Sequence, residues 1–341
     1  MFSFGCGFFL MINFWYSYYE LSPSGLLGAL AGDHVRKGAL LKVQWPNEKI
    51  GYADIFPWPE LGDADIETQI TALSKGKVSA LVEQSIWLAK RDADLRVKGK
   101  NAFAGAAKVK NHYLISDLSK FTDNTMGNLR QAGFTTLKIK VGRDIEEEVA
   151  FVQRSLRQNP ITIRLDFNAR TNFQDYERFM TQLSQAERAR IEYSEDPFPW
   201  DPEAWKEASV FAPVAMDNEY EKVNWDKLKG PPPFKVMVIK PARQDLDKTL
   251  KIVNKYAMRM VVTSAMDHPV GVAHACHVAA ELKKFYPNTL LDCGCLTLKV
   301  YRPNEFFSRV QTNGPYLTGI NGTGIGFDDL LTKVPWEPLK K

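Results

Sequence analysis

Short apolar segments that recur about every 25 residues are the feature that most constrains how this 341-residue chain can fold. Each segment ends in a polar residue and is followed by a stretch with helical periodicity. A strand, a helix and their two loops together need roughly 20–30 residues. The spacing therefore predicts a series of βα units. The intervals are 26, 29, 22, 23, 24 and 28 residues, measured between Lys140, Asp166, Glu195, Asp217, Lys240, Ser264 and Asp292.

Eight such segments are present, and several are apolar throughout, as parallel strands buried on both faces should be. A doubly wound sheet could give the same spacing over five or six units, but eight units favour closure into an α/β fold of the (β/α)8-barrel type. The predicted strands are Val109–Ile115, Thr136–Val141, Ile161–Asn168, Ile191–Glu195, Val214–Asp217, Lys235–Lys240, Met260–Ser264 and Thr289–Asp292.

The residues before the barrel follow a different pattern, which is typical of an α+β domain. Leu40–Trp45 and Ile50–Ile55 flank a turn and predict a hairpin, and helical periodicity covers residues 64–74 and 77–98. A glycine-rich tail follows the barrel. We therefore predict an α+β capping domain made of residues 1–100 plus 307–341, and a barrel over residues 101–306.

Composition and charge exclude several classes of protein. Lysine plus arginine (44) nearly balance aspartate plus glutamate (40), so phosphate neutralisation has no support and we expect no nucleic-acid partner. No apolar run is long enough to span a membrane. The aromatic-rich residues 1–19 lack a preceding basic residue, which argues against a signal peptide, and the start could be Met1 or Met11. With four cysteines in no zinc-site or disulfide-scaffold spacing, we expect a cytoplasmic protein with reduced thiols.

Three acidic residues, Asp166, Glu195 and Asp217, end three successive predicted strands. The carboxyl ends of parallel strands meet at one mouth of a barrel, so these side chains should lie together. Three carboxylates at one place repel each other unless a cation joins them, and oxygen ligands with room left for substrate suit Mg²⁺. The pattern therefore predicts a magnesium site. The alternative is that each acid is a solvated loop residue or a helix N-cap.

Three lysines accompany these acids. Lys138 and Lys140 lie on the same side of the second strand because alternate residues of a strand share a face, and Lys240 ends the sixth strand. Lysine is rarely buried without a charged partner, so inward-facing lysines indicate a charged site. A lysine beside another lysine and a metal ion should have a lowered pKa, which would let it act as a base near neutral pH. The alternative is that Lys138 and Lys140 form a solvated edge.

The motifs around these acids and lysines, in this order and at these intervals, resemble those of the enolase superfamily, and within it those of the muconate-lactonizing subgroup. Parts of two further segments, Gly51–Pro59 and Thr263–Met266, resemble one member that dehydrates a cyclohexadiene carboxylate to an aromatic acid in menaquinone biosynthesis. The motifs that carry the resemblance are Leu137–Val141, Arg164–Asn168, Glu195–Pro197, Asp217 and Val238–Pro241.

The resemblance implies a role for each of these residues. Lys140 would be the acid and base, Lys138 would hold its charge state and orientation, and Lys240 would stabilise the intermediate as a cation over a π system. The family commonly has an acid directly after the third metal ligand, but Asn218 stands there, so Glu219 is an alternative to Asp217. The implied metal ligands are Asp166, Glu195 and Asp217, and the implied substrate-binding residues are Arg164, Asn168 and Ser264.

The implied reaction begins with removal of the proton next to a substrate carboxylate. Bound Mg²⁺ would stabilise the resulting enediolate, and loss of the β-hydroxyl would complete a dehydration by a carbon–oxygen lyase. Lysines on both sides of the site would also suit an N-acylamino acid racemase or a dipeptide epimerase of the same superfamily. A non-catalytic binding barrel is a third hypothesis. We expect a small carboxylate as substrate, and the sequence predicts no oligomeric state.

Overall fold

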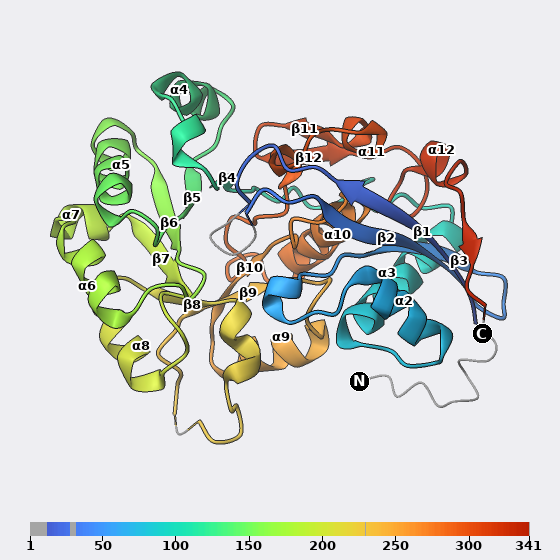
Figure 1. Ribbon diagram of the computed structural model, residues 1–341. Coiled ribbons are helices and arrows are strands. Elements are labelled where there is room, and N and C mark those ends of the chain that lie inside the picture. The colour runs from blue at the N-terminus through green and yellow to red at the C-terminus, as the bar shows by residue number, and fades with distance from the viewer. Residues whose placement is uncertain (1–11, 28–31, 229, 341) are drawn as a thin grey trace.

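The computed structural model describes residues 12–27, 32–228 and 230–340 (Figure 1). The possible starts at Met1 and Met11 lie outside these residues. Within them, one antiparallel sheet has the strand order β13-β1-β2-β3, with β1 at Asn13–Leu21 and β2 at Arg36–Gln44. The predicted hairpin is confirmed, because β2 pairs with β3 (Ile50–Ile55) across the expected turn. This sheet and the helices packed on it are called the cap below.

Two helices of the cap begin at the side-chain caps that their sequences supply. Asp65 accepts a hydrogen bond from Thr68 N at the start of α2 (Ile66–Ser74), and Ser79 accepts one from Val82 N at the start of α3 (Ala80–Val97). Helix α3 packs directly on β3. Gly51 permits this close approach, because a Cβ at this position would overlap the Ala89 carbonyl oxygen of α3.

Replacing Gly51 by alanine should destabilise the protein by about 2–3 kcal/mol, since the added methyl group must push α3 away from β3. The control is Gly127→Ala in α4 (Asp123–Gln131), where a Cβ would meet open space and should stabilise the helix by about 0.5–1 kcal/mol. Urea unfolding of both variants checks the pair. Equal stability of Gly51→Ala and the wild type would contradict this packing.

C-terminal segments complete the cap. Strand β13 (Glu337–Pro338) pairs with β1, and Ile325 N donates to the buried Asp92 carboxylate of α3. The blue N-terminal and red C-terminal ribbons accordingly lie side by side in Figure 1. The predicted domain boundaries themselves stay a prediction. The other elements of this region are η4 (Leu298–Val300), α11 (Glu305–Arg309), β11 (Gln311–Asn313), β12 (Tyr316–Gly319) and α12 (Asp328–Leu331).

The described residues also form a curled, parallel sheet of seven strands in the order β10-β9-β8-β7-β6-β5-β4, which confirms the predicted α/β barrel class. Its strands are β4 (Tyr113–Ile115), β5 (Thr136–Lys140), β6 (Thr162–Asp166), β7 (Ile191–Glu195), β8 (Val214–Met216), β9 (Val236–Ile239) and β10 (Arg259–Val262). Its helices, besides α4, are α5 (Ile145–Gln158), α6 (Phe173–Thr181), α7 (Gln185–Arg188), α8 (Pro202–Ala208), α9 (Leu246–Lys255) and α10 (Pro269–Phe285).

The eighth predicted strand, Thr289–Asp292, is wrong as a regular strand. The segment instead makes single parallel bridges, Leu290 to Met260 and Gly294 to Thr263 on one side and Cys293 to Asn111 on the other. Gly294 packs closely against His112 and Thr263, and a side chain at this position would have no room. The segment nevertheless connects both edges of the seven-stranded sheet.

Helix α10 lies between the barrel and the cap, since it contacts both β10 and β3. Within the described parts of the chain, no helix combines the length and the apolar character needed to cross a membrane.

Candidate active site

A cavity of about 740 Å³, open mouth included, lies between the carboxyl ends of the strands and the cap. Strand-end residues of the barrel form its charged side, and Leu27, Trp58, Glu60 and Leu61 of the cap cover it. The predicted site residues that line it are Lys138, Lys140, Asp166, Asn168, Asp217, Lys240 and Ser264.

The register of three neighbouring strands brings the first group of charges together. Lys140 pairs with Asp166, and Asp166 pairs with Glu195, at the ends of β5, β6 and β7. Lys138 Nζ lies 2.6 Å from Glu195 Oε1 and 3.0 Å from Asp166 Oδ2. Lys140 Nζ lies 3.1 Å from Asp166 Oδ2 and 2.8 Å from Asn168 Oδ1. Lys138 and Lys140 thus face inward, and the solvated-edge alternative is wrong.

These contacts fix the charge of Lys138. Burial lowers the pKa of Lys138, but the carboxylates of Asp166 and Glu195 outweigh burial and raise this pKa well above its ordinary value. Between these two carboxylates, Lys138 is held as a cation. Burial also raises the pKa of Asp166, but Lys138 and Lys140 more than reverse this and keep that carboxyl ionised.

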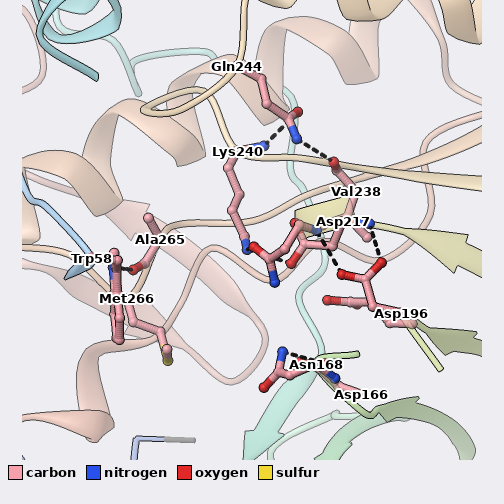
Figure 2. A network of polar contacts seen from close by, with 12 residues as sticks. Trp58, Asp166, Asn168, Asp196, Asp217, Val238, Lys240, Gln244, Ala265 and Met266 are labelled. Atoms are coloured by element: carbon pink, nitrogen blue, oxygen red, sulfur yellow. Dashed lines mark hydrogen bonds and ion pairs between the residues drawn. The ribbon is translucent and has the colours of Figure 1, made fainter. Parts of the chain in front are cut away.

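A second group of charges lies at the ends of β8 and β9. Lys240 Nζ lies 2.5 Å from Asp217 Oδ2 and 3.1 Å from Asn218 Oδ1. Figure 2 shows the Lys240 side chain extending from its strand end toward Asp217, while Gln244 accepts a hydrogen bond from Lys240 N and donates one to the Val238 carbonyl oxygen. Each pocket lysine at a strand end, Lys140 or Lys240, is therefore held by one aspartate and one asparagine.

Asp196 is a functional candidate that the sequence reasoning missed. It accepts hydrogen bonds from the backbone N atoms of Asp217 (2.9 Å) and Asn218 (2.7 Å), as Figure 2 shows for Asp217. Burial, Asp217 and Glu195 raise the pKa of Asp196 well above its ordinary value. The sequence did contain a signal for Asp196, because this acid directly follows Glu195. Its hydrogen bonds to the end of β8, however, can be recognised only when the neighbouring strand is in place.

Glu219, the alternative third ligand, has its carboxylate occupied elsewhere. Its two oxygens accept hydrogen bonds from Trp200 N and Lys222 Nζ, both at 2.8 Å, and its side chain does not line the cavity. Asp217 does line the cavity. The geometry therefore favours Asp217 over Glu219.

The carboxylate oxygens of the three strand-end acids are the candidate ligands for a metal ion. Within the described residues, no three carboxylate, histidine or cysteine side chains stand close enough together to hold an ion as they are placed. Lys138 lies between Asp166 and Glu195, and Lys240 contacts Asp217. However, Glu195 Oε2 and Asp217 Oδ1 are buried oxygens without a hydrogen-bond partner. Together with Asp166 they form an all-oxygen donor set on adjacent strands, which fits a hard divalent cation.

Of the three predicted substrate-binding residues, Arg164 differs from the expectation. Its guanidinium is fully buried below the cavity, where it contacts Glu192, His112 and the Asp292 carbonyl oxygen, and it does not line the cavity. The substrate-binding role that the resemblance implied for Arg164 is therefore not supported, because its side chain lies inside the barrel but too deep to reach a ligand. Asn168 and Ser264 line the cavity as expected.

The cap contributes side chains to the cavity wall and contacts with the barrel. Trp58 lines the cavity and its Nε1 donates to the Ala265 carbonyl oxygen at 2.9 Å, which ties the cap to the loop after β10 (Figure 2). Phe56 is buried within the cap and does not line the cavity. Arg243, another lining residue that the sequence reasoning missed, pairs with Asp63 of the cap at 2.7 Å.

Two buried acids meet where the cap joins the barrel beside the cavity. A Cβ at Gly271 would lie 2.5 Å from Asp267 Oδ2 and 3.0 Å from Asp54 Oδ2, so the two carboxyl groups face the same small space. Tyr19 Oη and His268 N donate to Asp54. Burial raises the pKa of Asp267 to about 7, and burial and Asp267 together raise the pKa of Asp54.

Asp267→Asn should stabilise the protein, and more so at higher pH. A carboxyl whose pKa rises on folding from 3.8 to about 7 favours the unfolded state as it ionises, so stability is lost between these pH values. We expect the thermal midpoint of Asp267→Asn to exceed that of the wild type by about 3 °C or more at pH 8, and by less at pH 5. The control is Glu177→Gln on the exposed side of α6. A pH-independent difference would contradict the buried pair.

Comparisons with known proteins agree with this fold. The barrel, its strand-end acids and lysines, and its separate cap define a member of the enolase superfamily, and the family model for the "Enolase C-terminal domain-like" region matches residues 122–328. The model for the "O-succinylbenzoate synthase, N-terminal domain" matches residues 14–95. An o-succinylbenzoate synthase from Bdellovibrio bacteriovorus is 44% identical over 330 residues, covering 97% of this chain and 99% of that one. The chain belongs to the o-succinylbenzoate synthase family, whose members are lyases.

Solved structures of the superfamily share the fold at low sequence identity. The L-Ala-D/L-Glu epimerase from Bacillus subtilis has a TM-score of 0.74 at 16% identity and covers 93% of this chain and 98% of its own. A dipeptide epimerase from Enterococcus faecalis, complexed with Mg and L-Leu-L-Tyr, has a TM-score of 0.70 at 18% identity, with 92% and 98% covered. A superfamily member from Roseovarius nubinhibens, complexed with magnesium, has a TM-score of 0.71 at 14% identity, with 96% and 98% covered.

Proposed function

We propose that this protein makes o-succinylbenzoate by the magnesium-dependent dehydration of 2-succinyl-6-hydroxy-2,4-cyclohexadiene-1-carboxylate. One observation is the main support for placing this reaction in the cavity. Lys140 and Lys240, four strands apart in the sheet, line the same cavity as Asp166 and Asp217. A flat ring with a carboxylate can lie between the two lysines with its carboxylate toward the acids.

Lys140 is the base in this proposal. Its neutral amine takes the proton from C1 of the ring, next to the carboxylate, and the resulting ammonium group then returns a proton to the departing hydroxyl of C6. A C1–C6 double bond forms, water leaves, and the ring becomes aromatic. The hydrogen bond to Asn168 Oδ1 and the contact with Asp166 hold the Lys140 amine at the strand end. One side chain thus serves both proton transfers.

The other lysines supply fixed positive charge. Lys240, held by Asp217 and Asn218, faces the ring from the opposite side and stabilises the negative charge that spreads into it. Lys138 stays protonated between Asp166 and Glu195, holds both side chains in place and helps to keep the Asp166 carboxyl ionised. Ser264 lies on the cavity wall, where it and nearby backbone amides receive the distal carboxylate of the substrate.

Asp166, Glu195 and Asp217 are the residues that would hold Mg²⁺. When bound, the cation supplies positive charge for the oxygens of the substrate carboxylate as the adjacent proton leaves. The two unpartnered carboxylate oxygens of Glu195 and Asp217 support this assignment. Asp196 orients the end of β8, and with it Asp217, from behind.

An epimerase or racemase is the second candidate, because lysines on both sides of a ring or an α-carbon can remove and return a proton on opposite faces. Solved structures with this fold include dipeptide epimerases. Incubation with the cyclohexadiene carboxylate and, separately, with N-succinyl amino acids and dipeptides tests both candidates. We expect rapid appearance of the aromatic product. Racemisation without dehydration would overturn the proposed function.

We expect the enzyme to act in the cytoplasm. Of the cysteines in the described residues, Cys276, Cys293 and Cys295 are buried free thiols, which agrees with a reducing compartment.

A further inference from the structure

We propose that His112 recognises the ketone oxygen of the substrate's succinyl chain through a hydrogen bond that its Nε2–H donates from the deep end of the cavity. The inference rests on the proposed function, since it concerns how that substrate is held. His112 lies just before β4 and lines the cavity, although only 4% of its surface is exposed. It is a binding residue that neither the motifs nor the strand ends indicated.

The tautomer of His112 follows from its partner. Nδ1 of His112 lies 2.7 Å from Arg164 Nη1, and a guanidinium has donors but no acceptor. Nδ1 must therefore be the nitrogen with the lone pair, and the ring proton lies on Nε2. Burial, Arg164 and Lys138 lower the pKa of His112 well below its ordinary value, so the ring stays neutral.

The Arg164 side chain is itself rigidly held. Its Nε donates to Glu192 and its Nη1 donates to the Asp292 carbonyl oxygen, both at 2.7 Å, and the guanidinium is fully buried. Arg164 thus fixes the His112 ring from below. This explains why an arginine predicted to bind substrate is present in the barrel without reaching the cavity.

The other edge of the ring is left uncovered by Gly294. A Cβ at residue 294 would lie 2.5 Å from Cε1 and 2.7 Å from Nε2 of His112, and Gly294 also lines the cavity. Among the described residues, none accepts a hydrogen bond from Nε2. An N–H donor on the cavity wall without a partner in the protein can donate to an oxygen of a ligand. The absence of a side chain at Gly294 therefore leaves His112 Nε2 accessible from the deep end of the cavity.

The chemistry of the donor selects the ketone from the oxygens of the substrate. A neutral N–H suits an uncharged carbonyl oxygen. The two carboxylates have other partners, which are the Mg²⁺ ion held by the strand-end acids for the ring carboxylate and the Ser264 region for the distal carboxylate. The ketone is attached directly to the ring carbon beside the one that carries the carboxylate. When that carboxylate points toward Asp166 and Asp217, the ketone must also lie deep in the cavity, near the His112 level.

The test compares two ligands on the magnesium-loaded protein by isothermal titration calorimetry. One is the product, o-succinylbenzoate, and the other is 2-(3-carboxypropyl)benzoate, in which a methylene group replaces the ketone. We expect the wild type to bind the product about tenfold more tightly, as the loss of one buried hydrogen bond predicts. His112→Asn keeps an acceptor for Arg164 but is too short to place a donor at Nε2, so its preference should fall to within about twofold. His112→Gln should regain part of the preference.

A tenfold preference that persists in His112→Asn, or no preference in the wild type, would overturn the inference. If His112→Asn does not fold, Gly294→Ala gives the same readout, because its methyl group would overlap the His112 ring and must displace Nε2 from its position, and a retained preference there is equally contrary. The proposed function is tested apart from this. A wild type that dehydrates the substrate but ignores the ketone contradicts only the role of His112, whereas a wild type that neither dehydrates the substrate nor binds the product contradicts the proposed function and the inference with it.

Discussion

Lys140→Ala should reduce turnover of the cyclohexadiene carboxylate by a factor of about 10⁴ or more, at the upper end of what a positioned base contributes. The loss should be this large because one amine serves both the abstraction of the proton and the departure of the hydroxyl. Lys140 lines the cavity, and the neighbouring Lys138 cannot replace it as a base because it is held as a cation between two carboxylates.

Steady-state assays of product formation measure this effect, and two further observations separate chemistry from folding. Product binding to Lys140→Ala should stay within about tenfold of wild type, and added methylamine should restore part of the rate. Lys235→Ala, an exposed lysine directly before β9, is the matched control and should leave turnover unchanged. Turnover by Lys140→Ala at a tenth of the wild-type rate would remove Lys140 from its proposed role.

Asp166→Asn should weaken Mg²⁺ binding, and turnover should fall with it. Replacing a residue that only contacts a metal ligand costs roughly 10–100-fold in metal affinity, so replacing a ligand should cost at least as much. The neutral amide removes a negative charge from the donor set and leaves Lys138 and Lys140 with one carboxylate fewer. Asp166 is suited to show this because it borders both lysines and is almost completely buried.

Glu219→Gln is the control for this variant, because its carboxylate binds Trp200 N and Lys222 outside the cavity. Metal titration of both variants, followed by calorimetry, should show a large effect for Asp166→Asn and none for Glu219→Gln. Excess Mg²⁺ should partly restore the activity of Asp166→Asn. The reverse order of effects would assign the third ligand to Glu219 and contradict the geometry.

The sequence predicted the parts of this site that follow from local periodicity. Lys138, Lys140 and Asp166 could be placed inside the barrel because alternation in a strand and the spacing of successive strands are local properties. The cap hairpin followed from a turn between two short apolar runs. The irregular pairing of the eighth segment could not be predicted, because its single bridges to Met260, Thr263 and Asn111 depend on residues at both edges of the sheet.

The residues that were missed or placed at the wrong depth depend on contacts between strands. Asp196 becomes informative only when β8 lies beside β7 and offers two backbone N–H groups. His112 becomes informative only when Gly294 and Arg164 surround it. Periodicity tells which residues face the inside of a barrel, but it does not tell which layer reaches the cavity, and Arg164 shows this difference.

The most direct test of the central claim is a crystal structure with Mn²⁺ and o-succinylbenzoate bound, in which anomalous scattering locates the ion. We predict one anomalous peak about 2.1 Å from carboxylate oxygens of Asp166, Glu195 and Asp217, with Lys140 and Lys240 on opposite sides of the product ring. A peak away from these acids, or a product ring with both lysines on the same side, would contradict the account.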